Sequence, residues 1–150
     1  MDDERDRLKE ANMRDDDLRA IFERVKTVAV VGYSANPERP SHQVAEFLHS
    51  KGYRVIPINP GLAGQYALGE EIFPGLAAIP ADITIDMVDV FRQSDAVPDL
   101  VEDVLKIMPK LDVLWLQLGV SHPIAQRRAA EAGNTVVASR CPKIEYPRVI

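Results

Sequence analysis

Apolar runs typical of buried strands alternate along this chain with segments whose apolar residues recur at helical spacing. The expected strands cover residues 27–31, 53–58, 83–90, 113–118 and 135–138, and the expected helices cover residues 16–26, 41–51, 98–108 and 121–132. This alternation predicts an α/β domain whose doubly wound, mainly parallel sheet of about five or six strands is covered by helices on both faces. Ligands of such sheets bind beyond the carboxyl ends of the strands, where the strand order reverses. The residues that follow each expected strand are therefore the first candidates for a functional site.

Local signals refine this prediction. N-caps are expected for three of the helices, at Asp16–Asp17, Ser41 and Ser121. Pro57 conflicts with a central strand, because proline cannot donate a hydrogen bond to the ladder. Weaker patterns indicate a short strand near residues 71–73 and a helical turn near residues 76–79, and residues 140–150 are expected to form a tail.

Size and composition limit the classes of protein to which the chain can belong. With 150 residues, 46% of them hydrophobic, it is long enough for one domain with its own core. The net charge of -5 argues against a nucleic-acid-binding protein, because neutralising many phosphates requires a basic surface. One cysteine and three scattered histidines provide neither a disulfide framework nor a metal-ligand pattern.

The N-terminal residues are rich in Asp, Glu, Arg and Lys and lack the apolar stretch of a signal peptide. No run approaches the roughly 20 apolar residues that a membrane helix needs. We therefore expect a cytoplasmic protein without membrane contacts, composed of a charged arm, residues 1–15, and one domain, residues 16–150.

The loop between the first expected strand and the next helix, residues 32–41, is the strongest candidate for a phosphate site. A strand–loop–helix unit presents free backbone N–H groups and the positive end of a helix dipole. Gly32 permits close backbone approach, and Ser34 and Ser41 supply hydroxyl groups. Arg39 can pair with a diphosphate through its planar guanidinium group. The alternative is an ordinary connecting loop in which Ser41 is only a helix cap, and both interpretations stay open at this point.

The usual glycine pattern of dinucleotide-binding domains is missing from this loop. Counting from Gly32, the second and third glycine positions hold Ser34 and Pro37. The second expected strand leads into Asn59, where an NAD-binding domain usually carries an acidic residue for the ribose hydroxyls. These departures disfavour, without excluding, a small enzyme that uses NAD(P) or another nucleotide.

Five sequence blocks, in order, carry a resemblance to a known family. They are Val31–Ser34 with Pro37–Ser41, Ile56–Pro60, Asp86–Arg92, Leu114–Gly119 and Arg140–Glu145. Together they resemble the stand-alone CoA-binding proteins of bacteria and archaea, from about residue 28 to residue 146. That family is similar to the CoA-binding domain of the succinyl-CoA synthetase alpha subunit and of nucleoside-diphosphate-forming acyl-CoA synthetases. The resemblance implies a Rossmann-like single domain with coenzyme A as its cofactor. Ser139 departs from the pattern, because Asp or Asn is expected there.

The resemblance also implies a site, carried over position by position. The diphosphate end of CoA would lie on the first loop, at Gly32, Ser34, Arg39, Pro40 and Ser41, with Tyr33 in the same loop. The adenosine would lie beside Asn59 and Pro60, and the ligand would be covered by Val90, Phe91 and Arg92 and bordered by Gln117 and Gly119. The alternatives are that Phe91 is a core residue, Arg92 a solvated charge and Gln117 a hydrogen-bonded loop partner.

Cys141 is the one candidate nucleophile, since it follows the last expected strand and could approach the pantetheine end of CoA. The alternatives are an inert packed thiol and a redox or regulatory protein in which Cys141 forms a mixed disulfide with CoA. His42 and His122 each follow an expected helix cap and are expected to be solvated or supporting residues rather than catalytic bases.

Asp86 and Asp89 would suggest an acid/base pair if their side chains shared a face of the strand. Their positions differ by three, an odd offset, so their side chains should point to opposite faces of the strand. We expect structural hydrogen bonding for Asp86 and leave a functional role open for Asp89.

These inferences favour a CoA-binding module without evident catalytic machinery. In the related synthetases, carboxylate activation requires further domains, including a phosphorylated histidine and a nucleotide-binding portion, for which 150 residues leave no room. The expected partners are CoA or an acyl-CoA, while a homodimer or a partner enzyme subunit stays open.

Overall fold

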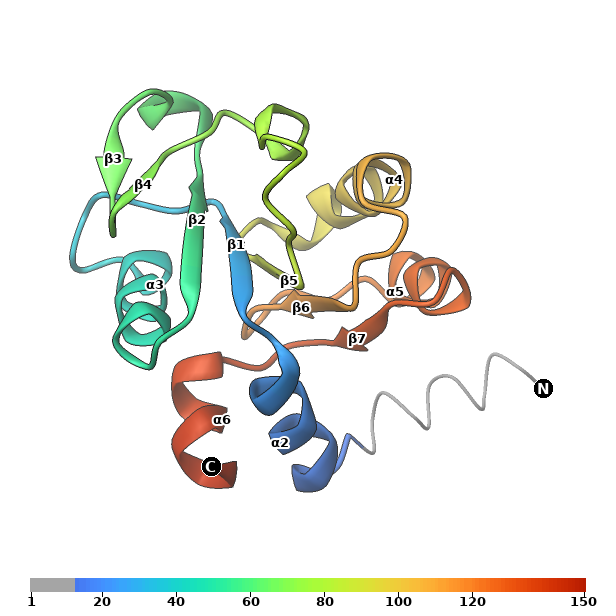
Figure 1. Cartoon of the computed structure of the whole chain (residues 1–150). Coiled ribbons are helices and arrows are strands. Elements are labelled where there is room, and N and C mark those ends of the chain that lie inside the picture. The colour runs from blue at the N-terminus through green and yellow to red at the C-terminus, as the bar shows by residue number, and fades with distance from the viewer. Residues whose placement is uncertain (1–12) are drawn as a thin grey trace.

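A computed structural model describes residues 13–150, which form a parallel sheet between two layers of helices (Figure 1). The sheet has five parallel strands in the order β2-β1-β5-β6-β7. The strands are β1 (Thr27–Val31), β2 (Arg54–Ile58), β5 (Met87–Val90), β6 (Val113–Leu116) and β7 (Thr135–Val137). The helices are α2 (Asp15–Arg24), α3 (Pro40–Ser50), α4 (Val97–Ile107), α5 (Pro123–Glu131) and α6 (Pro142–Val149). The predicted doubly wound, Rossmann-like α/β class is confirmed.

Most of the predicted charged arm, residues 1–12, lies outside the described residues. Met13 packs against the core, and α2 begins at Asp15, one residue before the predicted start of the domain. None of the helices within residues 13–150 combines the length and the apolar character that crossing a bilayer requires.

The connection between β2 and β5 contains only short elements. They are the antiparallel pair β3 (Tyr66–Ala67) and β4 (Glu70–Glu71) and the 3-10 turns η1 (Pro60–Leu62) and η2 (Leu76–Ala78). A third 3-10 turn, η3 (Ser94–Ala96), precedes α4. The predicted helical turn near residues 76–79 is confirmed, and Phe73 forms an isolated parallel bridge to Ile58 where a short strand was expected.

The sheet divides the core into two layers, each of which lies between one face of the sheet and the helices that cover it. Helices α2, α3 and α6 cover one face, and α4 and α5 cover the other (Figure 1). Because side chains alternate along a strand, Val28 lies in the first layer and Ala29 in the second. Trp115 is fully buried in the first layer, and its Nε1 donates to the carbonyl oxygen of Arg140 at 2.8 Å. This hydrogen bond ties the end of the sheet to the segment that enters α6.

The strand order reverses between β1 and β5. From β1 the chain passes through α3 to the outer strand β2, and the next connection returns it to the other side of β1 as β5. The two strands continue to pair at their carboxyl ends, where the N–H of Phe91 donates to the carbonyl oxygen of Val31 at 2.8 Å. The loops after β1 and β5 therefore leave the sheet side by side, at the place where sheets of this kind bind ligands.

The position of β2 explains Pro57, which was hard to reconcile with a central strand. Strand β2 is the outermost strand, and the carbonyl oxygen of Pro57 accepts a hydrogen bond from the N–H of Phe73 at 3.1 Å. In an extended strand the N–H and C=O of one residue point to the same side. The nitrogen of Pro57 therefore faces away from β1, and its lack of a hydrogen costs no bond to that strand.

The predicted caps at Ser41 and Ser121 are wrong by one or two residues, and proline explains both shifts. Pro40 and Pro123 occupy the first turn of α3 and α5, where a missing N–H costs nothing, so each helix starts at proline. Arg39 is the N-cap of α3, whereas His122 caps α5 by accepting the N–H of Ala125 at its Nδ1 (3.2 Å).

The cap of α2 differs from the expectation as well. The helix starts at Asp15, and the carboxylate of Asp17 accepts the N–H of Arg14, the N-cap residue, at 3.0 Å. Asp17 therefore acts from inside the first turn instead of preceding it.

Two further elements differ in extent from the prediction. Strand β5 begins at Met87 although the apolar pattern starts at Ile83, and the expected tail forms α6 despite Pro147 within it. Helix α6 docks on α2 through Arg148, whose guanidinium group lies 2.9 Å from Asp15 and 3.1 Å from Glu145. This tertiary contact has no local signal in the sequence.

We predict that Gly32→Ala destabilises the fold by about 2–4 kcal/mol, because Gly32 has φ +89° and a Cβ there would lie 2.5 Å from the carbonyl oxygen of Phe91. Urea denaturation measures this loss. Gly133→Ala is the matched control, since Gly133 has φ +109° and no heavy atom within 4 Å of an added Cβ. Equal losses in the two variants would show that the contact with Phe91 contributes nothing.

Candidate functional site

The fold gathers the candidate residues along one edge of the sheet. Because the strands are parallel, the segments that follow them all lie at the carboxyl edge. These segments carry, in strand order along the chain, Gly32, Tyr33 and Ser34; Asn59 and Pro60; Phe91 and Arg92; Gln117 and Gly119; and Cys141. Val90 is the last residue of β5 and is fully buried, so it supports this edge from within the core.

The β1–α3 loop begins by bonding to the neighbouring strand. The N–H groups of Gly32 and Tyr33 both donate to the carbonyl oxygen of Ile58, each at 3.1 Å. These two amides are therefore not available to a phosphate group. Ser34 Oγ accepts the N–H of Asn36 at 3.1 Å, which leaves its own O–H free to donate.

His42 fastens this loop to helix α3. Its Nδ1 lies 2.9 Å from the carbonyl oxygen of Ser34, and its Nε2 lies 2.7 Å from Glu46 Oε1. Its ring stacks on Tyr33 with centroids 5.7 Å apart. The sequence predicted a solvated or supporting residue, and the supporting role is the one observed. The spacing of His42 and Glu46, which places them on one helix face, is the signal from which this contact was predictable.

Two arginines at this edge have no protein partner. The guanidinium groups of Arg39 and Arg92 are exposed, and neither forms an ion pair or hydrogen bond with the described residues 13–150. Arg39 precedes α3, and Arg92 follows β5, so they belong to the two loops that leave the sheet side by side. Other arginines, such as Arg54 with Glu70 at 2.9 Å, are ion-paired. An anion at this edge would therefore find cations that no carboxylate already neutralises.

Asn59 uses its side chain to hold the loops together. Its Nδ2 donates to the carbonyl oxygen of Tyr33 at 2.7 Å, and its Oδ1 accepts the N–H of Gly61 at 2.7 Å. Both ends of the amide are thus committed to the fold. Pro60 starts the turn η1 and is exposed beside it.

The ends of β5 and β6 combine apolar packing with unpaired polar groups. Phe91 is half-buried and packs against the core layer under α3 and α6, as its alternative interpretation proposed. Asp89 is fully buried, and burial raises the pKa of its carboxyl well above the usual range. Gln117 is also buried, and its Oε1 has no hydrogen-bond partner in the structure, so it is not the satisfied loop partner that was the alternative.

Asp86 has the structural role that was expected. Its Oδ2 accepts the N–H groups of Lys26 and Thr27, at 3.0 and 2.9 Å, at the opposite end of the sheet. No group of three or more His, Cys, Asp or Glu side chains within residues 13–150 could hold a metal ion.

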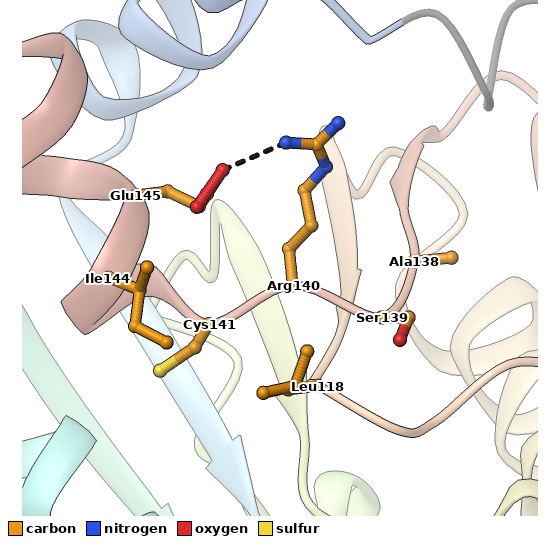
Figure 2. A pocket seen from close by; sticks show the side chains of 7 residues that line it. All are labelled: Leu118, Ala138, Ser139, Arg140, Cys141, Ile144 and Glu145. Atoms are coloured by element: carbon orange, nitrogen blue, oxygen red, sulfur yellow. Dashed lines mark hydrogen bonds and ion pairs between the residues drawn. The ribbon is translucent and has the colours of Figure 1, made fainter.

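A pocket of about 430 Å³ opens at the same edge, between the end of β6 and the start of α6 (Figure 2). It is lined by Leu118, Ala138, Ser139, Arg140, Cys141, Ile144 and Glu145. The thiol of Cys141 is buried, and the guanidinium group of Arg140 turns to Glu145 at 2.8 Å, as Figure 2 shows. The apolar walls come from Leu118 and Ile144, which are 60% and 53% exposed.

Ser139 explains why Asp or Asn is expected at its position. It has φ +53°, a conformation that Asn and Asp adopt more readily than other residues with a side chain. Its Oγ accepts the N–H of Gly119 at 3.0 Å, the contact that the oxygen of an Asp or Asn would make. Ser139 therefore supplies the hydrogen bond but not the conformational preference.

We predict that Ser139→Asn raises the free energy of unfolding by about 0.5–1 kcal/mol, because Asn suits the left-handed backbone and keeps an acceptor for Gly119. Ser139→Gly suits the backbone but lacks the acceptor, so its gain in urea denaturation should be smaller. A loss of stability in Ser139→Asn would contradict this interpretation.

Known proteins resemble this chain along most of its length. The family model described as a CoA binding domain matches residues 26–147. An uncharacterised protein of Bacillus subtilis, YneT, is 35% identical over 130 residues, which cover 87% of this chain and 92% of that protein. A solved structure from Thermus thermophilus has a TM-score of 0.84 and 38% identity, and the match covers 92% of this chain and 100% of that one.

A larger protein shares the fold at lower identity. The dinucleotide forming acetyl-coenzyme A synthetase 1 of Ca. Korarchaeum cryptofilum has a TM-score of 0.61 and 24% identity, and the match covers 76% of this chain but 26% of the synthetase. That likeness concerns the fold alone. The family match, by contrast, includes every strand of the sheet and all the loops at its carboxyl edge, and the chain belongs to the CoA-binding domain family.

Proposed function

We propose that this protein binds CoA or an acyl-CoA at the carboxyl edge of the sheet, with the diphosphate on the β1–α3 loop. The observation that carries the proposal is the pair of unpartnered guanidinium groups, Arg39 and Arg92, on the two loops that leave the sheet side by side. Charge-assisted hydrogen bonds from arginine to phosphate are among the stronger polar contacts in proteins. Because the overall charge is -5, these two guanidinium groups would provide a local attraction for an anion that the protein as a whole lacks.

The loop around Arg39 supplies further donors for the diphosphate. The O–H of Ser34 and the N-terminus of α3 belong to the β1–α3 connection that also carries Arg39. His42 holds this loop in place through the carbonyl oxygen of Ser34. The N–H groups of Gly32 and Tyr33 are already bonded to the carbonyl oxygen of Ile58. The diphosphate would therefore approach this loop because of the loop's shape, and not through hydrogen bonds to those two N–H groups.

The remaining parts of the ligand have space on either side of the diphosphate. The adenosine would lie toward Asn59 and Pro60, beside the turn η1. The pantetheine arm would run the other way along the edge, past Gln117 and Gly119, toward the pocket that contains Cys141. The exposed side chains of Leu118 and Ile144 would pack against its methyl and methylene groups.

We predict that isothermal titration calorimetry detects CoA binding with a dissociation constant in about the micromolar range. Arg39→Ala should weaken it by about 1.5–3 kcal/mol, the range for a hydrogen bond to a charged group. Arg54→Ala is the control, because Arg54 lies at the opposite end of its strand and its loss breaks only a surface ion pair with Glu70.

Titrations with NAD and NADP accompany this test. Binding of either dinucleotide without any response to CoA would overturn the proposal in favour of a nucleotide-dependent enzyme. An unchanged affinity in Arg39→Ala would remove that arginine from the site.

A second candidate function is thiol–disulfide exchange with CoA. The observation in its favour is that Cys141, the free cysteine of the chain, lines the pocket at the carboxyl edge. In this reaction the thiolate of Cys141 attacks one sulfur of CoA disulfide, forms a mixed disulfide and releases the second CoA as its thiolate.

We predict that incubation with CoA disulfide increases the mass of the protein by one CoA, and that dithiothreitol removes it. The same treatment should leave Cys141→Ser unchanged. A wild-type mass that stays constant in excess CoA disulfide would rule this candidate out, without affecting the noncovalent site.

A further inference from the structure

Two buried polar side chains beside the proposed site have hydrogen-bonding atoms without any partner. Asp89 is 0% exposed, and within residues 13–150 neither Oδ1 nor Oδ2 has a hydrogen-bond partner of good geometry. The backbone N–H of Val90 acts on the carboxyl as a weak donor, whose effect on the pKa is smaller than that of burial. Gln117 is 6% exposed, and its Oε1 is unpartnered as well. Asn134 shares this feature within residues 13–150, but its Nδ2 donates to Leu111 at 2.7 Å and it lies before β7, at the other end of the sheet.

Asp89 and Gln117 face the same side of neighbouring strands. Asp89 of β5 is paired in register with Trp115 of β6, and Gln117 follows Trp115 by two residues. The N–H of Gln117 still donates to the carbonyl oxygen of Val90, at 3.1 Å, so the strand alternation extends to this residue. Both side chains therefore point with Trp115 into the layer under α3 and α6, diagonally opposite each other.

The fold alone gives no reason for a carboxyl group at position 89. Its neighbours on the same face, Val30, Met87 and Trp115, are apolar and fully buried. A buried polar group without a partner costs about 1–3 kcal/mol of stability, and an apolar side chain of similar size would avoid this cost. Burial raises the pKa of this carboxyl and so favours its protonated form, which has one hydrogen-bond donor and one acceptor.

A ligand that satisfies both groups must itself be neutral and must donate and accept hydrogen bonds. The pantetheine arm of CoA has this chemistry, because each of its two amides carries one N–H donor and one C=O acceptor. The phosphates and the adenine do not match a buried neutral acid equally well, since phosphate is charged and costly to desolvate. The end of β6 also lies between the diphosphate loop and the pocket that contains Cys141, along the path assigned to this arm.

We propose that Asp89 and Gln117 form the recognition site for an amide of the pantetheine arm. Gln117 Oε1 accepts the amide N–H, and the Asp89 O–H donates to the amide carbonyl oxygen. Gln117 retains a small exposed surface and would meet the ligand first, whereas contact with the fully buried Asp89 requires the side chains that cover it to shift. This assignment rests on the proposed CoA site and adds the residues that distinguish CoA from a bare nucleotide.

The test compares two ligands on matched variants by isothermal titration calorimetry. The ligands are CoA and 3′-phosphoadenosine 5′-diphosphate, which keeps the nucleotide and diphosphate but lacks the pantetheine arm. Asp89→Leu and Gln117→Leu should each weaken CoA binding roughly tenfold and leave the affinity for the nucleotide unchanged. Asp89→Asn, which is neutral and keeps a donor and an acceptor, should bind CoA nearly as the wild type does.

Urea denaturation of the same variants separates a ligand-binding role from a structural one. Asp89→Leu should be at least as stable as the wild type, because it removes a buried group without partners. If Asp89→Leu does not fold, the carboxyl of Asp89 contributes to stability instead of reducing it. The titrations of Gln117→Leu and Asp89→Asn with the two ligands then test the inference.

Equal losses for both ligands, or unchanged CoA binding in the two leucine variants, would overturn this inference and leave the proposed function standing. Equal affinity of the wild type for CoA and for the nucleotide would overturn it too. A wild type that binds neither ligand would instead refute the proposed function, and this inference with it.

Discussion

Gly32 and the carbonyl group of Phe91 approach each other so closely that no Cβ fits between them. The approach occurs where the strand order reverses, and it keeps β1 and β5 paired up to the residues from which their loops depart. The loop after β1 turns toward α3, and the loop after β5 turns toward α4, on the opposite face of the sheet. The chain thus leaves the carboxyl edge open between them. The proposed ligand site is a consequence of this topology together with one glycine.

The polar groups around that edge divide into two kinds. The side chains of Asn59 and His42 form hydrogen bonds within the protein, with Tyr33, Ser34 and Glu46 among their partners. These bonds fix the shape of the loops. Within residues 13–150, the guanidinium groups of Arg39 and Arg92 are exposed to solvent without a partner, and the carboxyl oxygens of Asp89 and Oε1 of Gln117 are buried without one. An acidic protein with two unpartnered arginines at one edge suits a single anionic ligand better than a polyanion. Family membership supports CoA binding in general, and the proposed site for CoA uses these four groups.

Much of the fold was predictable, because long-period patterns in the sequence reflect burial. The strand at residues 27–31 and the helix near residues 98–108 were found to within one residue, since each carries a strong apolar pattern. The helix starts at Pro40 and Pro123 were missed, because serine was given more weight as a cap than proline as a first helical residue. Helix α6 was missed because it is held by contacts with α2 that are far apart in sequence.

For the site, too, features with a local sequence pattern were predictable, and features that depend on contacts between distant residues were not. Parallel topology alone predicted that the candidate segments lie at one edge, and the structure shows them there. The family blocks named the candidate residues in these segments, and the part of these residues in binding stays a prediction. The contacts of Asn59 with Tyr33 and of His42 with Ser34 depend on tertiary distances and were not predictable, whereas the contact of His42 with Glu46 was predictable from their spacing on one helix. The lack of partners for Asp89 and Gln117 also appears only in three dimensions, because it depends on what the surrounding side chains fail to offer.

The central claim concerns where a diphosphate lies on this protein. A crystal structure of the protein with CoA tests it most directly. The account predicts the diphosphate beyond the carboxyl ends of β1 and β5, within hydrogen-bond distance of the guanidinium group of Arg39. A CoA molecule bound elsewhere, with Arg39 still in solvent and the β1–α3 loop empty, would contradict it.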